Sequence, residues 1–281
     1  MAGRAYIGTS GWNYKEWRHG FYRDVRQQDW LRHCAQHFSA IEVNATFYRL
    51  QQKSTFARWR EQTPDHFRFA IKANRYLTHN SKLRTPARSI QLDRTRALAL
   101  QEKLTAVVWQ MPRHLRKNLP RLEKFARALK RWPEARHVIE FRHDSWFDND
   151  VADCLRRHGL AVCQSDAPDW PLWDAVTSDL VYVRLHGHTK TYGSNYSDKE
   201  LTTWARCIRR WLKQGHDVHV YFDNTAKGYA VSNALTLMAI LRTRNSATAK
   251  RHRKRKAELG SGSQKRIKRR QPATNAAQVT T

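Results

Sequence analysis

Short apolar segments of strand-like composition recur eight times between residues 5 and 224, and they alternate with stretches of helical periodicity. Most are rich in β-branched and aromatic side chains, which is typical of strands buried in a parallel sheet. Alternation of strands with helices predicts βαβ units, and eight repeats favour a closed barrel over an open sheet. The eight segments are AYIGTS (5–10), AIEVNA (40–45), FRFAIKA (67–73), TAVVWQM (105–111), HVIEFR (137–142), AVCQSD (161–166), LVYVRLHG (180–187) and VHVYFDN (218–224).

The clearest helical segment between these strands is 198–214. Ser197 and Glu200 form a Ser-x-x-Glu capping box at its start, and Gly215 is a suitable residue to end it. Its apolar stripe at helical spacing consists of Leu201, Trp204, Ala205, Ile208, Trp211 and Leu212. The predicted fold class is therefore α/β, a (β/α)8 TIM barrel that occupies residues 1–242.

The composition changes abruptly after Leu241. Residues 242–281 hold thirteen Lys and Arg against one acid, a net of +12, which leaves +16 of the chain's formal +28 on residues 1–241. With almost no large apolar side chains, residues 243–281 are predicted to form a disordered basic tail. The blocks KRHRKRK (250–256) and QKRIKRR (264–270) predict nonspecific attraction to nucleic acid through residues 250–270; a solvated tail with no dedicated partner is the alternative.

Further features of the sequence indicate the cellular compartment and the state of the cysteines. The N-terminus lacks a hydrophobic signal region, and no apolar run approaches the ~20 residues that a membrane span needs. The tail lacks hydrophobic anchors as well, so we expect no membrane role and a cytoplasmic location. The cysteines show no metal-ligand spacing and are expected to be reduced and buried: Cys34, Cys154, Cys163 and Cys207.

Polar residues occur near the C-terminal ends of seven predicted strands, where a purely structural strand would be apolar. Side chains alternate with period two, so Glu140 and Arg142 share one face, and the apolar residues between them take the other. The polar face is expected to point into the barrel at its C-terminal mouth, where active sites of this fold lie. These residues are Glu42, Asn44, Lys72, Gln110, Glu140, Arg142, Asp166, Arg184, His186 and either Asp223 or Asn224.

At these positions the sequence resembles the DUF72 (YecE-like) family. The resemblance rests on seven ordered segments that span residues 6–241: IGTSGWNYKEW, IEVNATFYR, FRFAIKANRYLTH, VVWQMP, EFRHDSW, YVRLHG and YFDNTAKGYAVSNAL. It implies a TIM-barrel fold but no particular reaction, because the family's biochemical role is not established. Asp223 stands where family members often have Asn, which adds an acid to the site.

An anionic ligand is the first interpretation of the mouth. Lys72, Arg142 and Arg184 are candidates to bind its phosphate or carboxylate group, because Arg binds such groups in a bidentate way. The loops after the last two strands offer Gly187, Gly193 and Gly228, and such loops form a recurrent phosphate site in this fold. Further candidate substrate contacts are Asn44, Gln110, Asn224 and Tyr192.

The acids Glu42, Glu140 and Asp166, together with His186, are candidates for proton transfer. The same groups are also compatible with a divalent metal or with glycosidase chemistry, although no local metal motif supports a metal and no cofactor is identifiable. An ion network that merely plugs the mouth is the structural alternative. Aromatic residues on the predicted rim, such as Trp12 and Tyr14, are suited either to stacking on a base or sugar or to packing.

Three functions are compatible with these residues. The first is an enzyme, with hydrolysis as the leading reaction, that acts on a phosphate- or carboxylate-bearing small molecule. The second is a nucleic-acid-associated protein that uses the mouth and the basic tail. The third is a noncatalytic barrel that binds a metabolite.

Overall fold

The computed structural model describes residues 2–84 and 86–243, and eight β-strands lie within them where the sequence predicts them. Every pairing between neighbouring strands is parallel. The strand order is β1-β8-β7-β6-β5-β4-β3-β2, which confirms the predicted (β/α)8 barrel. The strands are β1 (Ala5–Thr9), β2 (Ala40–Val43), β3 (Arg68–Lys72), β4 (Leu104–Gln110), β5 (Arg136–Glu140), β6 (Ala161–Asp166), β7 (Leu180–Leu185) and β8 (Asp217–Phe222).

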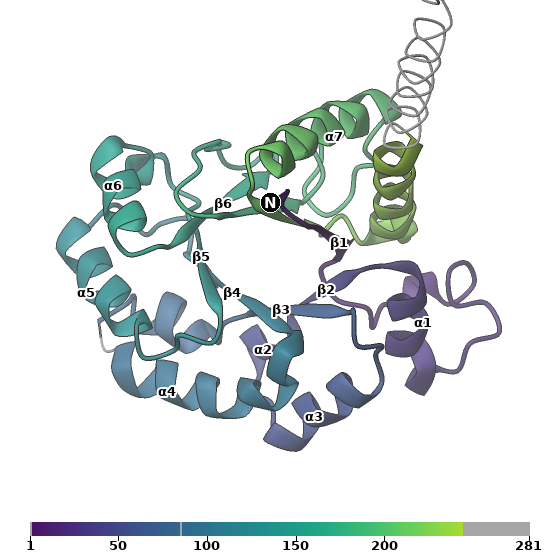
Figure 1. Ribbon diagram of the computed structural model, residues 1–281, viewed down its shortest axis with the longest axis horizontal. Coiled ribbons are helices and arrows are strands. Elements are labelled where there is room, and N and C mark those ends of the chain that lie inside the picture. The colour runs from purple at the N-terminus through teal and green to yellow at the C-terminus, as the bar shows by residue number, and fades with distance from the viewer. Residues whose placement is uncertain (1, 85, 244–281) are drawn as a thin grey trace, which may run out of the picture. The chain divides into compact units, whose positions relative to one another are not determined.

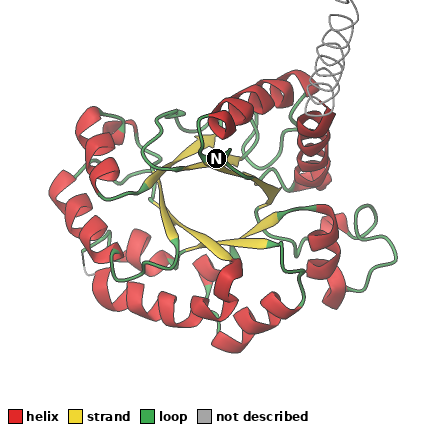
Figure 2. Cartoon of the chain, viewed as in Figure 1, coloured by secondary structure: helices red, strands yellow, loops and turns green. Residues whose placement is uncertain are grey.

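The barrel closes where β1 meets β2. Ser10 pairs with Glu42 as a parallel bridge, and the Gly11 N–H donates to the Glu42 carbonyl oxygen at 2.7 Å. Gly8 permits the close approach, since a Cβ there would lie 1.8 Å from the carbonyl oxygen of Ala40. This β1–β2 junction makes the eight strands a ring, which Figure 2 shows in yellow inside the red helices.

Helices follow most strands and lie outside the ring (Figure 1). The predicted capping box is present at α7, where Ser197 and Glu200 bond each other's backbone in both directions, and Gly215 follows with a φ of 94°. The connection 167–179 between β6 and β7 contains no helix. The α-helices are α1 (Trp30–His37), α2 (Ala45–Tyr48), α3 (Lys53–Glu61), α4 (Pro86–Ala97), α5 (Leu119–Leu129), α6 (Asn149–Arg157) and α7 (Asp198–Lys213), and residues 229–243 are also helical.

The interior of the barrel is packed with small and large side chains in complementary places. Ala40, Ala70 and Ala106 are fully buried there, and the space beside them is filled by the rings of Tyr182 and Tyr221. The four cysteines are free as expected: three are buried, and Cys207 is partly exposed. The apolar layer leaves the C-terminal ends of the strands to the polar residues.

The chain separates into one compact unit, Met1–Met238, and a second that begins at Ala239. The helix that starts at residue 229 runs to Thr243, the last described residue. The predicted tail, 243–281, and its blocks at 250–256 and 264–270 therefore lie outside the described residues, apart from Thr243. Within residues 2–84 and 86–243, no helix combines the length and the apolar character that crossing a membrane requires.

Candidate functional site at the barrel mouth

The side chain of Arg184, at the C-terminal end of β7, is fully buried and contacts three carboxylates. Its Nη1 donates to Glu140 Oε2 at 2.7 Å, and its Nη2 donates to Glu42 Oε1 at 2.8 Å and to Asp223 Oδ2 at 2.9 Å. Nε adds a second bond to Glu42 Oε1 at 3.1 Å. Because the acids come from β2, β5 and the end of β8, one guanidinium ties together strands from both halves of the chain.

Glu42 is held by neutral donors as well. Ser10 Oγ donates to its Oε1 at 2.7 Å, and the Tyr182 hydroxyl donates to its Oε2 at 2.6 Å. With the bonds from Arg184, both oxygens of this fully buried carboxylate are satisfied. Full satisfaction is what a buried charge requires.

Glu140 binds a second arginine. Arg142 Nε donates to Glu140 Oε1 at 2.8 Å, and Ser165 Oγ donates to the same oxygen at 3.2 Å. The Arg142 guanidinium lies 4.1 Å above the ring of Trp170, whose Nε1 donates to Ser165 Oγ. Stacking and ion pairing together fix the plane of this guanidinium.

Two carboxylates of this network, those of Glu140 and Asp223, stay ionised. Burial by itself would raise the pKa of Glu140, but the charges of Arg142 and Arg184 hold it well below its usual range. The same opposition leaves the pKa of Asp223 lowered, with Arg184 as the main stabilising charge. Burial would lower the pKa of Arg184, yet the surrounding acids raise it, so the guanidinium is permanently charged.

Two cationic groups at the mouth are not fully paired. Lys72 is only 7% exposed, and its Nζ makes no hydrogen bond or ion pair with any described residue; it lies 4.0 Å from the ring centre of Phe47. Arg142 Nη2 is buried and also has no hydrogen-bond partner within residues 2–84 and 86–243. Burial, with the nearby charge of Arg184, lowers the pKa of Lys72 to about 8.

His79 reports a positive electrostatic potential in the same region. Burial, together with the charges of Lys72, Arg75 and Arg142, lowers its pKa to about 4. Its ring lies 5.0 Å from that of Phe47, which Lys72 also contacts. The loop after β3 therefore presents a neutral imidazole close to the charges of Lys72, Arg75 and Arg142.

His186 lies between two acids. Its Nδ1 is 3.0 Å from Asp223 Oδ2 and its Nε2 is 3.6 Å from Glu140 Oε1, although neither contact has hydrogen-bond geometry. The rings of Trp170 and Tyr192 pack edge-on against it at 5.1 and 5.6 Å. His186 thus lies beside two acids of the Arg184 network, and the rings of Trp170 and Tyr192 cover it.

Asp166 does not join this network. Its Oδ2 accepts a hydrogen bond from the Tyr196 hydroxyl at 2.7 Å, and its Oδ1 lies 3.1 Å from His188 Nδ1. Ser165, the preceding residue, contacts Glu140 instead. Because neighbouring residues on a strand face opposite sides, Asp166 points to the β7–α7 loop.

The remaining predicted contacts are spread around the mouth. Asn224 Nδ2 donates to Ser194 O and to Asn233 Oδ1, both at 2.9 Å, so it anchors the loop after β7, and Asp223 is the residue that reaches Arg184. Gln110 is buried at the end of β4 without a side-chain hydrogen bond to a described residue. Two others lie nearer solvent: Asn44, which donates weakly to Ser10 O at 3.5 Å, and Tyr192, which is 43% exposed.

Three hydroxyl groups of the site, those of Ser10, Tyr182 and Ser165, were not among the predicted site residues. Period two from Arg184 places Tyr182 on the same inward face, and the same rule places Ser165 inward when its neighbour Asp166 points out. Ser10 is the last residue of the first predicted strand segment, so the sequence alone places it at the C-terminal end of a strand. Hydroxyls in strands are common, and nothing in their spacing distinguished these.

Aromatic residues in the loops after β1 and β5 divide into two groups, and the predicted rim residues Trp12 and Tyr14 belong to the second. Trp17 and Trp146 are 1% exposed and belong to the packed core. Trp12 and Tyr14 are partly exposed and line an open groove beside β1 and β2. Trp12 and Tyr14 are therefore accessible to a ligand in the groove.

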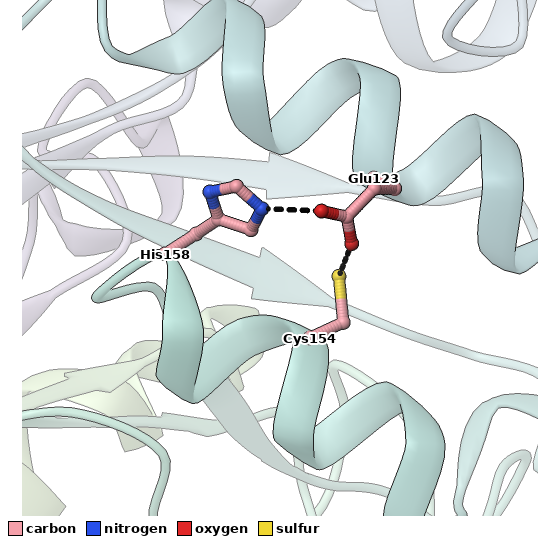
Figure 3. A group of neighbouring side chains, drawn as sticks. All are labelled: Glu123, Cys154 and His158. Atoms are coloured by element: carbon pink, nitrogen blue, oxygen red, sulfur yellow. Dashed lines mark hydrogen bonds and ion pairs between the residues drawn. The ribbon is translucent and has the colours of Figure 1, made fainter.

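A possible set of metal ligands lies away from the mouth, between α5 and α6. Cys154 Sγ donates to Glu123 Oε2 at 3.1 Å, and His158 Nε2 lies 2.8 Å from Glu123 Oε1 (Figure 3). Arg157 also donates to this carboxylate at 3.1 Å. Hydrogen bonds from His158 and Cys154 lower the pKa of Glu123 to about 2, so the group is already satisfied as a hydrogen-bond cluster.

Comparison with known proteins gives consistent matches along the barrel. Residues 6–258 match the family described as "Protein of unknown function DUF72". The UPF0759 protein YunF of Bacillus subtilis is 24% identical over 282 residues, which cover 88% of this chain and 98% of YunF. The UPF0759 protein YecE of Escherichia coli K12 is 31% identical over 157 residues, 55% of this chain and 54% of YecE.

Solved structures agree. A DUF72 family protein from Thermotoga maritima superposes with a TM-score of 0.77 at 25% identity, covering 85% of this chain and 99% of that one. One from Enterococcus faecalis gives a TM-score of 0.75 at 18% identity, over 85% and 95% of the two chains. With the family match spanning nearly all of the barrel, this chain belongs to the DUF72 family.

Proposed function

We propose that this barrel is an enzyme that binds a phosphate- or carboxylate-bearing substrate at its C-terminal mouth. The observation that carries the proposal is that two cationic side chains at the mouth have donors without an acceptor in the described part of the chain: the buried Nη2 of Arg142, and the Nζ of Lys72, whose side chain is 7% exposed. A buried donor without an acceptor costs free energy, so its retention is best explained by a ligand that supplies the missing acceptor.

The two arginines have different roles in this proposal. Every nitrogen of Arg184 already donates to a carboxylate, so Arg184 organises the site. Arg142 uses Nε toward Glu140 and keeps Nη2 for a ligand. Lys72 and Arg142 would therefore bind the anion, while Glu42 and Glu140 keep Arg184 neutralised beneath it.

The reaction that we propose is hydrolysis, with His186 as the proton acceptor. Its Nδ1 lies 3.0 Å from Asp223 Oδ2 without hydrogen-bond geometry, and a rotation of the ring that aligned the two atoms would give the histidine–carboxylate pair that orients an imidazole for proton transfer. A water molecule deprotonated by His186 would attack the phosphorus or carbonyl carbon of an ester, the bond to the leaving alcohol oxygen would break, and the protonated His186 would give the proton to that oxygen. Lys72 and Arg142 would stabilise the negative charge that develops on the substrate oxygens.

Anion binding is tested by calorimetric titration of the full chain with inorganic phosphate. Lys72→Met and Arg142→Gln should each weaken binding about tenfold, equivalent to about 1.4 kcal/mol. Lys213→Met, at an exposed lysine in the last turn of α7, is the matched control, and the basic tail is the same in all variants. Equal affinities in all four proteins would refute an anion site at the mouth.

Catalysis is tested separately, with a panel of phosphomonoesters and carboxylic esters. Turnover that falls at least a hundredfold in His186→Gln, with phosphate affinity retained, would support proton transfer by His186. Phosphate binding without turnover of any ester would instead favour the noncatalytic metabolite-binding barrel.

A second candidate, nucleic-acid association, is favoured by the formal net charge of +28. Replacing every Lys and Arg of 250–256 and 264–270 with Gln should then flatten the dependence of DNA affinity on salt, by roughly 0.9 in slope for each phosphate that the tail no longer neutralises. An unchanged slope would exclude these blocks as the anchor.

A further inference from the structure

An open groove of about 530 Å³ lies beside the mouth, formed by the residues after β1 and β2 and by α3. Trp12 packs edge-on against Trp59 at 5.3 Å, and Trp59 is almost fully buried, so this pair makes a rigid apolar wall. Tyr48, at the end of α2, is 70% exposed and is the most exposed large hydrophobic residue of those described. An unburied aromatic ring at the edge of a groove is a typical stacking surface for a planar ligand.

The groove and the cationic site share α2. Phe47 holds Lys72 Nζ 4.0 Å from its ring centre, and the ring of Tyr48, the next residue, lies edge-on to Phe47 at 5.0 Å. A single aromatic ring therefore separates the ammonium group from the exposed ring. Asn44, which precedes α2, lines the groove and has a buried Oδ1 to which no described residue donates a hydrogen bond.

The polar lining of the groove suits a nucleobase. Amide side chains occur on both sides, and amides pair with the edges of bases by donating and accepting at once. Arg58 is the one charged side chain among the described lining residues, which include no acid. The amides are Asn13, Gln27, Asn44 and Gln51.

We infer that the groove is a base-binding subsite and that the substrate class is a phosphorylated nucleoside, either a free mononucleotide or the terminal nucleotide of a strand. The base would stack on Tyr48 and Trp12, and its phosphate would reach Lys72 and Arg142. This inference rests on the anion site proposed above for the phosphate, while the groove supplies the base contacts independently.

The test compares AMP, ribose 5-phosphate and adenosine as ligands of the full chain by calorimetry. AMP and ribose 5-phosphate carry the same phosphate, so attraction to the basic tail is equal for both. AMP should bind more tightly than ribose 5-phosphate, and Tyr48→Ala should weaken the binding of AMP and of adenosine about tenfold, because the variant loses the ring on which the base stacks. Tyr48→Phe, which keeps the ring, should retain wild-type affinity for all three ligands.

A 5′-phosphorylated single-stranded oligonucleotide is titrated as a fourth ligand. Two results together would overturn the inference: AMP and ribose 5-phosphate bind equally, and Tyr48→Ala changes the affinity of none of the three base-containing ligands. An effect on the oligonucleotide alone would support it and identify the strand terminus as the source of the base. Loss of adenosine binding in Tyr48→Ala, with AMP insensitive to Lys72→Met, would support the base subsite and refute the anion site. If Lys72→Met instead abolishes binding of AMP and ribose 5-phosphate, and Tyr48→Ala changes the affinity of no base-containing ligand, the anion site is supported and the base subsite is refuted.

Discussion

Two cations at the barrel mouth have opposite surroundings. Arg184 is fully buried and donates to three carboxylates, so removing any one of its partners would leave charge uncompensated. Lys72 is almost as buried, but among the described residues its ammonium group has the face of Phe47 in place of an acceptor. The first arrangement stabilises the fold, and the second destabilises it unless an anion is bound.

Lys72→Met should therefore stabilise the free protein at pH 7, by up to about 3 kcal/mol for a pKa lowered from 10.5 to about 8. Between these values the unfolded chain binds a proton that the folded chain does not. Wild-type stability thus rises with pH from about 8 to 10.5, and the advantage of Lys72→Met shrinks over that range. Urea unfolding at several pH values measures this, and a constant difference between the proteins would contradict it.

Glu140→Gln should destabilise the protein strongly, by about 3–5 kcal/mol, because it leaves Arg184 and Arg142 beside a neutral amide. Glu134→Gln is the matched control, since Glu134 pairs with Arg94 at the surface and should cost less than about 1 kcal/mol. Denaturant unfolding of the two variants gives the comparison. Similar losses of stability would show that the buried network contributes no more than a surface pair.

At the scale of strands and helices, alternation explains most of what the sequence predicted. Period two placed Glu140 with Arg142, and the structure brings both to the mouth. It also separates Ser165 from Asp166, but an apolar run such as AVCQSD does not reveal which of the two faces inward. The groove that Tyr48 lines was not predictable either, because its shape depends on how α2 and α3 pack after β2.

Gly8→Ala should disrupt the β1–β2 junction. Its Cβ would lie 1.8 Å from a backbone carbonyl oxygen, and no rotamer change can relieve a backbone clash. We expect a loss of more than about 3 kcal/mol, near the upper end for single substitutions. Gly20→Ala, where a Cβ would have open space, should stay within about 1 kcal/mol of wild type. Thermal unfolding of both variants decides, and a stable Gly8→Ala protein would mean that the strands can separate without cost.

For the molecule as a whole, charge is the dominant property. Thirteen of 52 Lys and Arg lie in residues 242–281, but the rest leave residues 1–241 with a formal excess of +16. Like charges at this density repel one another and oppose a compact state. In the proposed function, the same field would attract anions to the mouth, where Arg142 Nη2 has no acceptor among the described residues and Lys72 Nζ contacts the ring of Phe47.

Sodium chloride should consequently stabilise the protein against heat. Raising its concentration from about 0.05 to about 0.5 M shortens the screening length from roughly 14 to roughly 4 Å, which weakens the repulsion. The melting temperature is expected to rise by several degrees with chloride. A melting temperature that falls or stays level would show that favourable surface pairs outweigh the excess charge.

The β1–β2 junction also has a kinetic meaning. Ser10 and Glu42, which close the ring, are the residues through which the first strand reaches Arg184, and β1 itself pairs with β8, the last strand. The site is thus assembled from contacts that span nearly the whole barrel in sequence, and contacts of such separation form late and slowly in folding. Until β8 has been made and has paired with β1, Glu42 and Glu140 lack the arrangement around Arg184 that forms the site. The proposed ligand site is therefore complete only after β1 has paired with both β8 and β2.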